Sequence, residues 1–188
     1  GEYPDWLTLV DNLNGTADLS GTPTNDNVGD HSVVLTVSDG FVSVNQEFTI
    51  TVSNTNDAPV FTSTPTTSAV EDAGYSYTAA ASDIDIGDNL TYAVPTLPGW
   101  LTFDVATQIL SGTPLNDDVG TQEVVLSVTD LEGATAGQLF TISVSNTNDA
   151  PVFTSIPIEE ATEDAGYSYT MVAGDVDDGD ELTYTAQA

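Results

Sequence analysis

Oxygen-bearing side chains recur in this chain with a spacing that favours the binding of a hard cation. The stretch SNTNDAPVFTS occupies residues 53–63 and returns letter for letter at residues 145–155. An acidic loop with the spacing Asp-x-Asp-x-Gly-x-Asn follows at residues 83–89, and Asp130 ends an alternating apolar run. Alternate side chains of an extended segment point the same way, so Asp-x-Asp presents two carboxylates together. Carboxylate and carbonyl oxygens are the ligands that Ca²⁺ prefers.

Short strands are the elements that would bring these residues together. Apolar and polar residues alternate at Val33–Val37 and Val124–Val128, and turn-forming residues such as Asp39-Gly40 separate such runs. Apolar residues at helical spacing are missing. These patterns predict an all-β fold, a Greek-key sandwich with about seven strands. In a sandwich, alternate loops lie at the same end, so the acidic loop and Asp130 are expected to meet the SNTNDAPVFTS joint.

A long internal repeat defines the domain organisation. Asn54 and Asn146 are 92 positions apart, as are the two copies of EDAGYSYT that begin at Glu71 and Glu163. A 92-residue unit suits tandem sandwich domains rather than a solenoid. We therefore expect residues 1–57 to be the C-terminal part of one repeat, residues 58–149 a complete repeat, and residues 150–188 the N-terminal part of a further repeat.

The two partial repeats are too small to bury both faces of a sandwich alone. Two interpretations follow. The chain is a window on a longer protein, or residues 150–188 complete residues 1–57 of a neighbouring chain. The second interpretation predicts an open head-to-tail filament built by strand donation between subunits.

The charge balance excludes several functions. The 188 residues contain 30 Asp and Glu but neither Lys nor Arg, which gives a formal net charge of −30. Such a surface repels nucleic acid and acidic membranes. The longest apolar runs are far too short for membrane insertion. The acids are interleaved with apolar residues, unlike a disordered tail. The chain should therefore take cations from outside, although solvated acidic turns are the simpler alternative.

An enzyme is not expected. The single histidine, His31, has no cysteine or lysine with which to form a nucleophile and base pair. A carboxylate pair for glycoside hydrolysis remains open from sequence, but acids repeated at each joint favour a structural role. Trp6 and Trp100 occupy the same place in two repeats, so core packing is favoured over sugar stacking. The loop at residues 175–181 differs from an EF-hand, because its glycine is one place early and strand residues follow.

Several motifs together resemble cadherin repeats. NTNDAPVF resembles the cadherin joint DxNDNxPxF, the segment from Ala81 to Tyr92 resembles the cadherin AxDxDxGxN…Y segment, and Val128-Thr129-Asp130 resembles the strand-end AxD. With WLTF, SGTP and DVG, the chain looks most like the bacterial cadherin-like (dystroglycan-type) and putative Ig-like tandem repeats of large surface adhesins. The resemblance implies a cadherin-like sandwich with Ca²⁺ at each joint.

The resemblance also implies which residues hold the ion. The strand-end aspartate of the second joint would be Asp39 of another copy, and the early-strand glutamates would reach the joint below their own domain. Two departures leave the number of ions open: Asn54 stands where cadherins have aspartate, and the cadherin LDRE segment is missing. The implied ligands are Asn56, Asp57, Asp83, Asp85 and Asp130 at the first joint, Asn148, Asp149, Asp175, Asp177 and Asp39 at the second, and Glu71 and Glu163.

The sequence thus predicts a calcium-stabilised structural repeat of an extracellular adhesin stalk or surface filament. Ca²⁺ at the joints would rigidify a rod, and other copies of the chain would bind head-to-tail. The alternative is a carbohydrate-binding or self-associating cadherin-like adhesion module, with glycans as partners. In either case the expected location is extracellular, at the cell surface.

Overall fold

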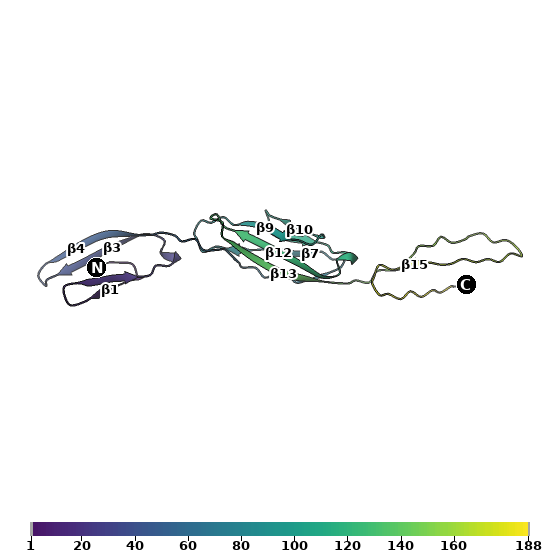
Figure 1. The fold of residues 1–188 in the computed structure, drawn as a ribbon, viewed down its shortest axis with the longest axis horizontal. Coiled ribbons are helices and arrows are strands. Elements are labelled where there is room, and N and C mark those ends of the chain that lie inside the picture. The colour runs from purple at the N-terminus through teal and green to yellow at the C-terminus, as the bar shows by residue number, and fades with distance from the viewer. Residues whose placement is uncertain (1, 188) are drawn as a thin grey trace. The chain divides into compact units, whose positions relative to one another are not determined.

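The computed structural model describes residues 2–187, which are built almost entirely from strands and loops (Figure 1). Two three-residue 3-10 turns, η1 (Asn25–Asn27) and η2 (Asn116–Asp118), were not expected from the sequence. Both follow an SGTP turn, one in each repeat. Across residues 2–187, no helix has the length and apolar character needed to cross a membrane.

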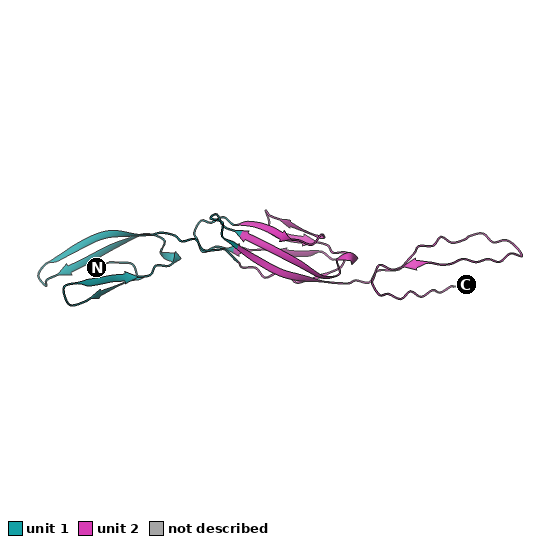
Figure 2. Ribbon diagram, viewed as in Figure 1, with its two compact units in different colours: residues 1–60, 82–90, 129–135 teal, residues 61–81, 91–128, 136–188 magenta. Residues whose placement is uncertain are grey.

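The chain divides into two compact units (Figure 2). The first unit contains residues 1–60 together with the loops 82–90 and 129–135, and the second contains residues 61–81, 91–128 and 136–188. The acidic loop and the turn after Asp130 therefore belong to the same unit as the first SNTNDA segment. This division places the predicted residues of the first joint in one unit.

Two sheets of the second unit form the predicted sandwich. One sheet has the order β10 (Leu101–Asp104), β11 (Ile109–Gly112), β7 (Tyr75–Thr78). The other has the order β6 (Ser68–Val70), β13 (Thr135–Ser145), β12 (Gly120–Thr129), β9 (Thr91–Thr96). All pairings whose register is defined are antiparallel except β6 with β13, which is parallel. The all-β fold class predicted from the alternation is confirmed.

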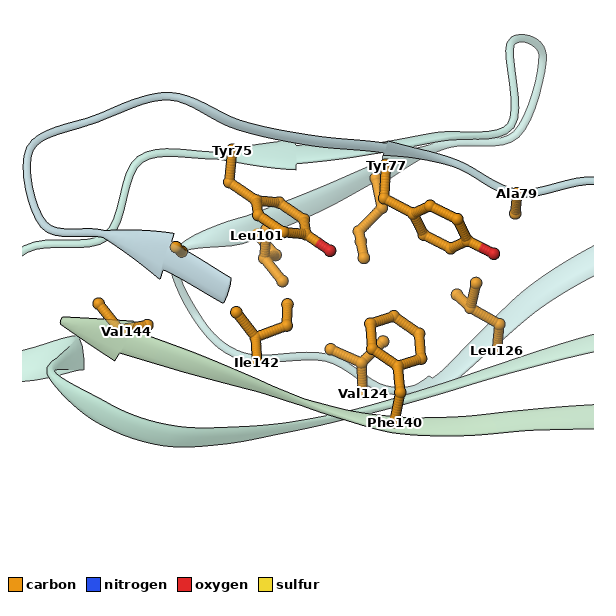
Figure 3. Packing of buried hydrophobic residues seen from close by; sticks show 11 residues of the cluster. Tyr75, Tyr77, Ala79, Leu101, Val124, Leu126, Phe140, Ile142 and Val144 are labelled. Atoms are coloured by element: carbon orange, nitrogen blue, oxygen red, sulfur yellow. The ribbon is translucent and has the colours of Figure 1, made fainter. Parts of the chain in front are cut away.

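The core lies between these two sheets (Figure 3). Leu110, Leu126 and Ile142 are completely buried, because strand alternation turns every second residue inward. Tyr77 packs edge-to-face on Phe140 with ring centroids 5.7 Å apart. Trp100 lies partly buried against the same cluster, as a core tryptophan was expected to do.

A buried tyrosine links three segments of this sandwich through its hydroxyl. The Tyr77 hydroxyl donates to Oε1 of Gln138 at 2.8 Å and lies 2.6 Å from Oγ of Ser63. The Gln138 amide in turn donates to the carbonyl of Ser63 at 2.9 Å. This closed ring satisfies the polar end of an otherwise apolar side chain.

The strands of the first unit form two hairpins. β1 (Leu7–Asp11) pairs with β2 (Ala17–Gly21), and β3 (Gly29–Ser38) pairs with β4 (Ser43–Val52). The turn predicted at Asp39-Gly40 is confirmed as the β3–β4 connection. Two short strands, β5 (Val60–Phe61) and β8 (Ala81–Ser82), flank the joint.

Burial in the first unit is less complete than in the second. Val33 is completely buried, Leu35 is half-buried, and Val37 is 71% exposed. Phe48 on the facing strand is 38% exposed, whereas its equivalent Phe140 is 8% exposed. The reason is that the described strands of this unit leave part of the inward face uncovered.

Residues 150–187 carry few strands. β14 (Val152–Phe153) pairs with β15 (Ala173–Gly174), and no other strand is assigned within this segment. The sequence YSYT forms β7 at residues 75–78 but no strand at residues 167–170. Tyr167 is 55% exposed, whereas its equivalent Tyr75 is 6% exposed. The same letters differ in structure because β7 has β11 beside it.

Candidate metal centre

The first joint connects the SNTNDA segment to the acidic loop through a backbone hydrogen bond. The N–H of Asp57 donates to Oδ2 of Asp85 at 2.7 Å, and the N–H of Asp85 donates to Oδ1 of Asp83 at 2.9 Å. Pro59, fully buried just after the joint, fixes the direction in which the chain leaves it. Asp85 is itself only 7% exposed. Two of the predicted carboxylates are thereby held beside the joint.

Asp130 also lies at the first joint, and neighbouring N–H groups orient its carboxylate. Its Oδ1 accepts the N–H groups of Gly133 and Ala134 at 2.6 and 2.8 Å. Its Oδ2 accepts the side-chain amide of Asn56 at 2.9 Å. The Asn56 amide and then these backbone N–H groups lower the pKa of Asp130, against the opposing effect of burial. Asp130 therefore stays ionised in this site.

Three carboxylates of the first joint face one another. Oxygens of Asp83, Asp88 and Asp130 all lie within 4.8 Å of one another. Oδ2 of Asp83 and Oδ2 of Asp88 are buried and have no hydrogen-bond partner. Burial, followed by the charges of Glu132 and Asp83, raises the pKa of Asp88. Unpartnered buried oxygens among like charges fit a bound cation, which would supply the missing partner.

Asn25 was not predicted, yet it also reaches this joint. Its side-chain amide donates to Oδ2 of Asp57 at 2.9 Å and to Oδ1 of Asp85 at 3.1 Å. The residue stands in η1 and follows the SGTP turn. Asp88 was missed as well, although Asp180 recurs 92 positions later and was an available signal. Both residues complete a polar shell around the predicted ligands.

The second joint repeats the central hydrogen bonds. The N–H of Asp149 donates to Oδ2 of Asp177 at 2.6 Å, and the N–H of Asp177 donates to Oδ1 of Asp175 at 3.0 Å. Asp175, Asp177 and Asp180 form a second group of oxygens within 4.8 Å of one another. Asp177 is 7% exposed and its Oδ1 has no partner. The second joint therefore also has an unpartnered buried oxygen among like charges, which fits a bound cation.

Glu71 reaches the second joint from within the complete repeat. It is 3% exposed, and its Oε2 accepts the N–H of Thr147 at 3.0 Å. Oxygens of Glu71, Asp72 and Asp149 lie within 4.8 Å of one another. Burial, then the charges of Asp177 and Asp72, raise the pKa of Asp149. The structure thus brings the early-strand glutamate to the joint below its own domain.

Three predicted ligands lie apart from these acidic groups within the described chain, and Asp39 was expected to act from another copy. Asp39 is exposed and accepts the N–H groups of Phe41 and Val42 in its own turn. Those N–H groups, Val42 first, lower the pKa of Asp39. Asn148 donates to the carbonyl of Asp149 at 2.6 Å instead of reaching a strand-end aspartate. Glu163 is exposed and belongs to none of the acidic groups formed by the described residues.

His31 has a structural position in a strand. It is half-buried in β3, its Nε2 lies 2.5 Å from the carbonyl of Asn27, and its ring packs edge-to-face on Trp6. Its equivalent, Gln122, donates to the carbonyl of Asp118 at 2.9 Å. Because glutamine makes the equivalent hydrogen bond, this position is best explained by stabilisation of the turn and not by proton transfer.

Comparison with known families gives one match over most of the chain. Residues 1–53 and 58–145 match the model of the family described as putative Ig domain. Both SGTP turns and both tryptophans lie inside the matched residues. No curated protein sequence matches the chain.

Solved structures similar to the chain include two protocadherins. The extracellular domains 1–4 of protocadherin gamma B3 match with a TM-score of 0.57 and 23% identity, over 92% of this chain and 48% of that one. Domains 1–2 of human protocadherin-24 match with a TM-score of 0.51 and 22% identity, over 78% and 79%. An endo-fucoidan hydrolase of glycoside hydrolase family 107 matches at 33% identity with a TM-score of 0.42, over 78% of this chain. The chain spans 23% of that hydrolase's length.

Proposed function

The chain belongs to the putative Ig domain family, and we propose that it is a calcium-stabilised structural repeat of an extracellular adhesin stalk or surface filament. Ca²⁺ would bind at each SNTNDA joint and hold the acidic loop against it. Other copies of the chain would associate head-to-tail. Cadherin-like and Ig-like domains are typically non-enzymatic, and the proposed role requires no catalysis.

The observation that carries the proposal is the set of unpartnered carboxylate oxygens at the joints. Asp83 and Asp88 at the first joint and Asp177 at the second each leave a buried oxygen without a partner. The chain has no Lys or Arg to neutralise them. A bound cation would compensate these charges and supply the missing partners. Oxygen-only ligand sets of this kind select Ca²⁺ over transition metals.

The chemistry that such an ion would supply is electrostatic. It would cancel repulsion among the carboxylates and tie the SNTNDA segment to the loop at residues 83–89. The chain's own contribution is positioning: the N–H of Asp57 orients Asp85, and Asn56 with Gly133 orients Asp130. Ca²⁺ tolerates six to eight ligands in flexible geometry, whereas Mg²⁺ demands a near-ideal octahedron. We therefore expect Ca²⁺ to stabilise the joints and Mg²⁺ to do so poorly.

Thermal unfolding in Ca²⁺ and in excess chelator tests the proposal. The melting temperature should rise with Ca²⁺ and fall back when EGTA is added, because the ion binds the folded form selectively. Sodium chloride at matched ionic strength is the control, since general screening also relieves repulsion among exposed charges. Small-angle X-ray scattering should show that the chain is more flexible after chelation. A melting temperature and scattering profile that EGTA leaves unchanged would contradict the proposal.

A further inference from the structure

We propose that Asn25 and Asn116, one in each 3-10 turn, are further ligands of the joint cations through their side-chain carbonyl oxygens. The inference rests on the proposed function and adds a residue that the expected ligand set does not contain. Each asparagine is the first residue of its turn, η1 or η2, and stands two places after an SGTP segment. Each joint would thereby receive a ligand from a third segment of the chain.

The Asn25 side chain lies at the distance of a fellow ligand from two carboxylates of the first joint. Its amide nitrogen is 2.9 Å from Oδ2 of Asp57 and 3.1 Å from Oδ1 of Asp85. All three residues belong to the first unit. Neighbouring oxygens that each lie about 2.3–2.6 Å from one Ca²⁺ are themselves roughly 3 Å apart. The three side chains therefore have the spacing of groups that share an ion.

A side-chain amide can present either of its two polar atoms to the joint. Rotation by about 180° around its terminal bond exchanges the nitrogen and the oxygen with little change in shape. Without a cation, the N–H groups of Asn25 face the carboxylates, because an amide oxygen would add to the negative charge there. With a cation among the carboxylates, the oxygen is the favoured atom, because N–H groups carry partial positive charge. Asn25 would therefore stabilise both states of the joint.

The second joint supplies an independent observation. Nδ2 of Asn116 and Oδ1 of Asp177 are both buried and have no hydrogen-bond partner. Their equivalents at the first joint, Nδ2 of Asn25 and Oδ1 of Asp85, are hydrogen-bonded to each other. Since the bond is made at one joint and not at the other, the fold of the turn does not depend on it. A cation bound by Asp177 and by the rotated amide of Asn116 would supply the partner that Asp177 lacks.

Backbone contacts place the turn that carries Asn116 beside the second joint. Pro114 is fully buried, and its carbonyl accepts the N–H of Asp72 at 3.0 Å. Carboxylate oxygens of Asp72 and Asp149 lie within 4.8 Å of one another. All of these residues belong to the second unit. The SGTP segment is thus tied to a residue whose carboxylate faces the joint.

The 3-10 turn itself does not use the asparagine side chain. In η1, Oδ1 of Asn27 accepts the N–H of Thr24 at 2.9 Å. In η2, Oδ2 of Asp118 accepts the N–H of Leu115 at the same distance. Asn25 contributes only its backbone to the turn, and its side chain hydrogen-bonds to the joint. Asparagine and aspartate are therefore interchangeable where the turn is capped, and this supplies a matched control.

Calcium titration of three variants tests the ligand role. Asn25→Leu removes both amide atoms at similar size and should weaken Ca²⁺ binding at the first joint by about tenfold or more. Asn25→Asp keeps an oxygen but loses the N–H groups. It should bind Ca²⁺ at least as tightly as the control Asn27→Asp, which adds the same charge two residues away, where the other repeat has Asp118.

Thermal unfolding in EGTA gives a second readout that does not depend on bound calcium. Asn25→Asp should lower the calcium-free melting temperature, because a further carboxylate would then face Asp57 and Asp85 without an N–H group between them. Asn27→Asp should leave it nearly unchanged. Equal melting temperatures for the two variants would show that residue 25 does not face the carboxylates in solution, and would overturn the inference.

The two joints can be separated in the same calorimetric titration. Asn25→Leu should leave the sites of the second joint at the affinity of the parent chain, and Asn116→Leu should leave those of the first. The double variant Asn25→Leu/Asn116→Leu should retain no site of parental affinity. Sites that kept this affinity in the double variant would contradict the ligand role of both asparagines.

The remaining outcomes distinguish this inference from the calcium proposal. Weaker binding by Asn25→Leu, together with binding by Asn25→Asp that equals or exceeds that of Asn27→Asp, supports the ligand role. Binding by Asn25→Asp that is weaker than that of Asn27→Asp would show that the amide acts only as an N–H donor, and would overturn it. A parental affinity in Asn25→Leu also overturns it but leaves the calcium proposal standing. A parent chain that binds no Ca²⁺ removes the proposed function and the inference together.

Discussion

The backbone N–H of Asp57 donates a 2.7 Å hydrogen bond to Oδ2 of Asp85, and the equivalent bond joins Asp149 to Asp177 at 2.6 Å. The bond connects a residue that leads into a repeat with a loop inside that repeat. The bond occupies Oδ2 of Asp85. The other oxygen, Oδ1, also lies at the joint, where it accepts the side-chain amide of Asn25. A carboxylate is thereby oriented before any ion arrives.

Asp85→Asn should weaken Ca²⁺ binding at the first joint by about tenfold or more, since it removes a charge and keeps the shape. The calcium-dependent rise in melting temperature should shrink in the same variant. Isothermal titration calorimetry with CaCl₂ measures the first effect and thermal unfolding the second. Glu123→Gln, an exposed residue of β12, removes the same charge away from the joints and should leave both unchanged. Identical isotherms for Asp85→Asn and the parent chain would exclude Asp85 as a ligand.

Asp88 should make the calcium-free protein less stable at neutral pH than in mild acid. Its pKa is raised in the fold, mainly by burial, so its contribution is favourable below the pKa of the unfolded chain, about 3.9. That contribution is lost as pH rises through the raised pKa of the folded form. Asp88→Asn should therefore raise the calcium-free melting temperature at pH 7 and make no difference near pH 3.

Asp130→Asn is the opposite control for this pH dependence. The pKa of Asp130 is lowered, first by the Asn56 amide, so its stabilisation is present above the unfolded pKa and is lost as pH falls. The variant should lower the calcium-free melting temperature at pH 7. Thermal unfolding in EGTA from pH 3 to pH 8 compares the two variants. If both substitutions moved the melting temperature at pH 7 in the same direction, repulsion among the carboxylates of the joint would not be the cause of the pH dependence.

Leu110→Ala should cost about 2–5 kcal/mol of unfolding free energy, because it empties a completely buried site. Leu19 occupies the same place in the preceding repeat but is half-buried, so Leu19→Ala should cost less. Urea unfolding at low protein concentration measures both, and urea avoids the ionic screening that guanidinium adds. Equal losses would mean that the first unit is as well covered as the complete repeat.

Gly112→Ala should destabilise the complete repeat by about 1–3 kcal/mol through a steric clash. A Cβ at Gly112 would lie 2.0 Å from the backbone carbonyl oxygen of Trp100, so β11 would have to move away from β10. Gly99→Ala is the control, because no atom lies within 4 Å of its Cβ, and its effect should be small. Urea unfolding of the two variants checks the contrast. Similar values for both would show that the β10–β11 pair is more adaptable than its geometry suggests.

Part of the candidate site could be predicted from sequence because its residues lie at strand ends and recur. The spacing of Asp83 and Asp85 and the position of Asp130 placed them at one end of a sandwich, where the structure brings them together with Asp57. Asn25 could not be placed in this way. It is 32 residues from Asp57 and 60 from Asp85, and no local pattern connects them.

The turn at Gly87 explains another difference. The loop pattern drew attention to Asn89, but Gly87 has a φ of 101°, and the turn that it allows carries Asp88 inward while Asn89 stays exposed. The error in strand prediction has a non-local cause. YSYT is a strand at residues 75–78 and not at residues 167–170, because strand formation depends on the neighbouring strand as well as on the residues themselves.

The parallel pair formed by β6 and β13 decides how the complete repeat would carry mechanical load. Ser68, Ala69 and Val70 face Ser143, Val144 and Ser145 in register. The chain enters the repeat ahead of β6 and leaves it after β13, so tension applied along the chain pulls the two strands past each other. Their hydrogen bonds are then strained together in shear instead of being opened one at a time. Tension on the complete repeat would therefore load the β6–β13 pair in shear.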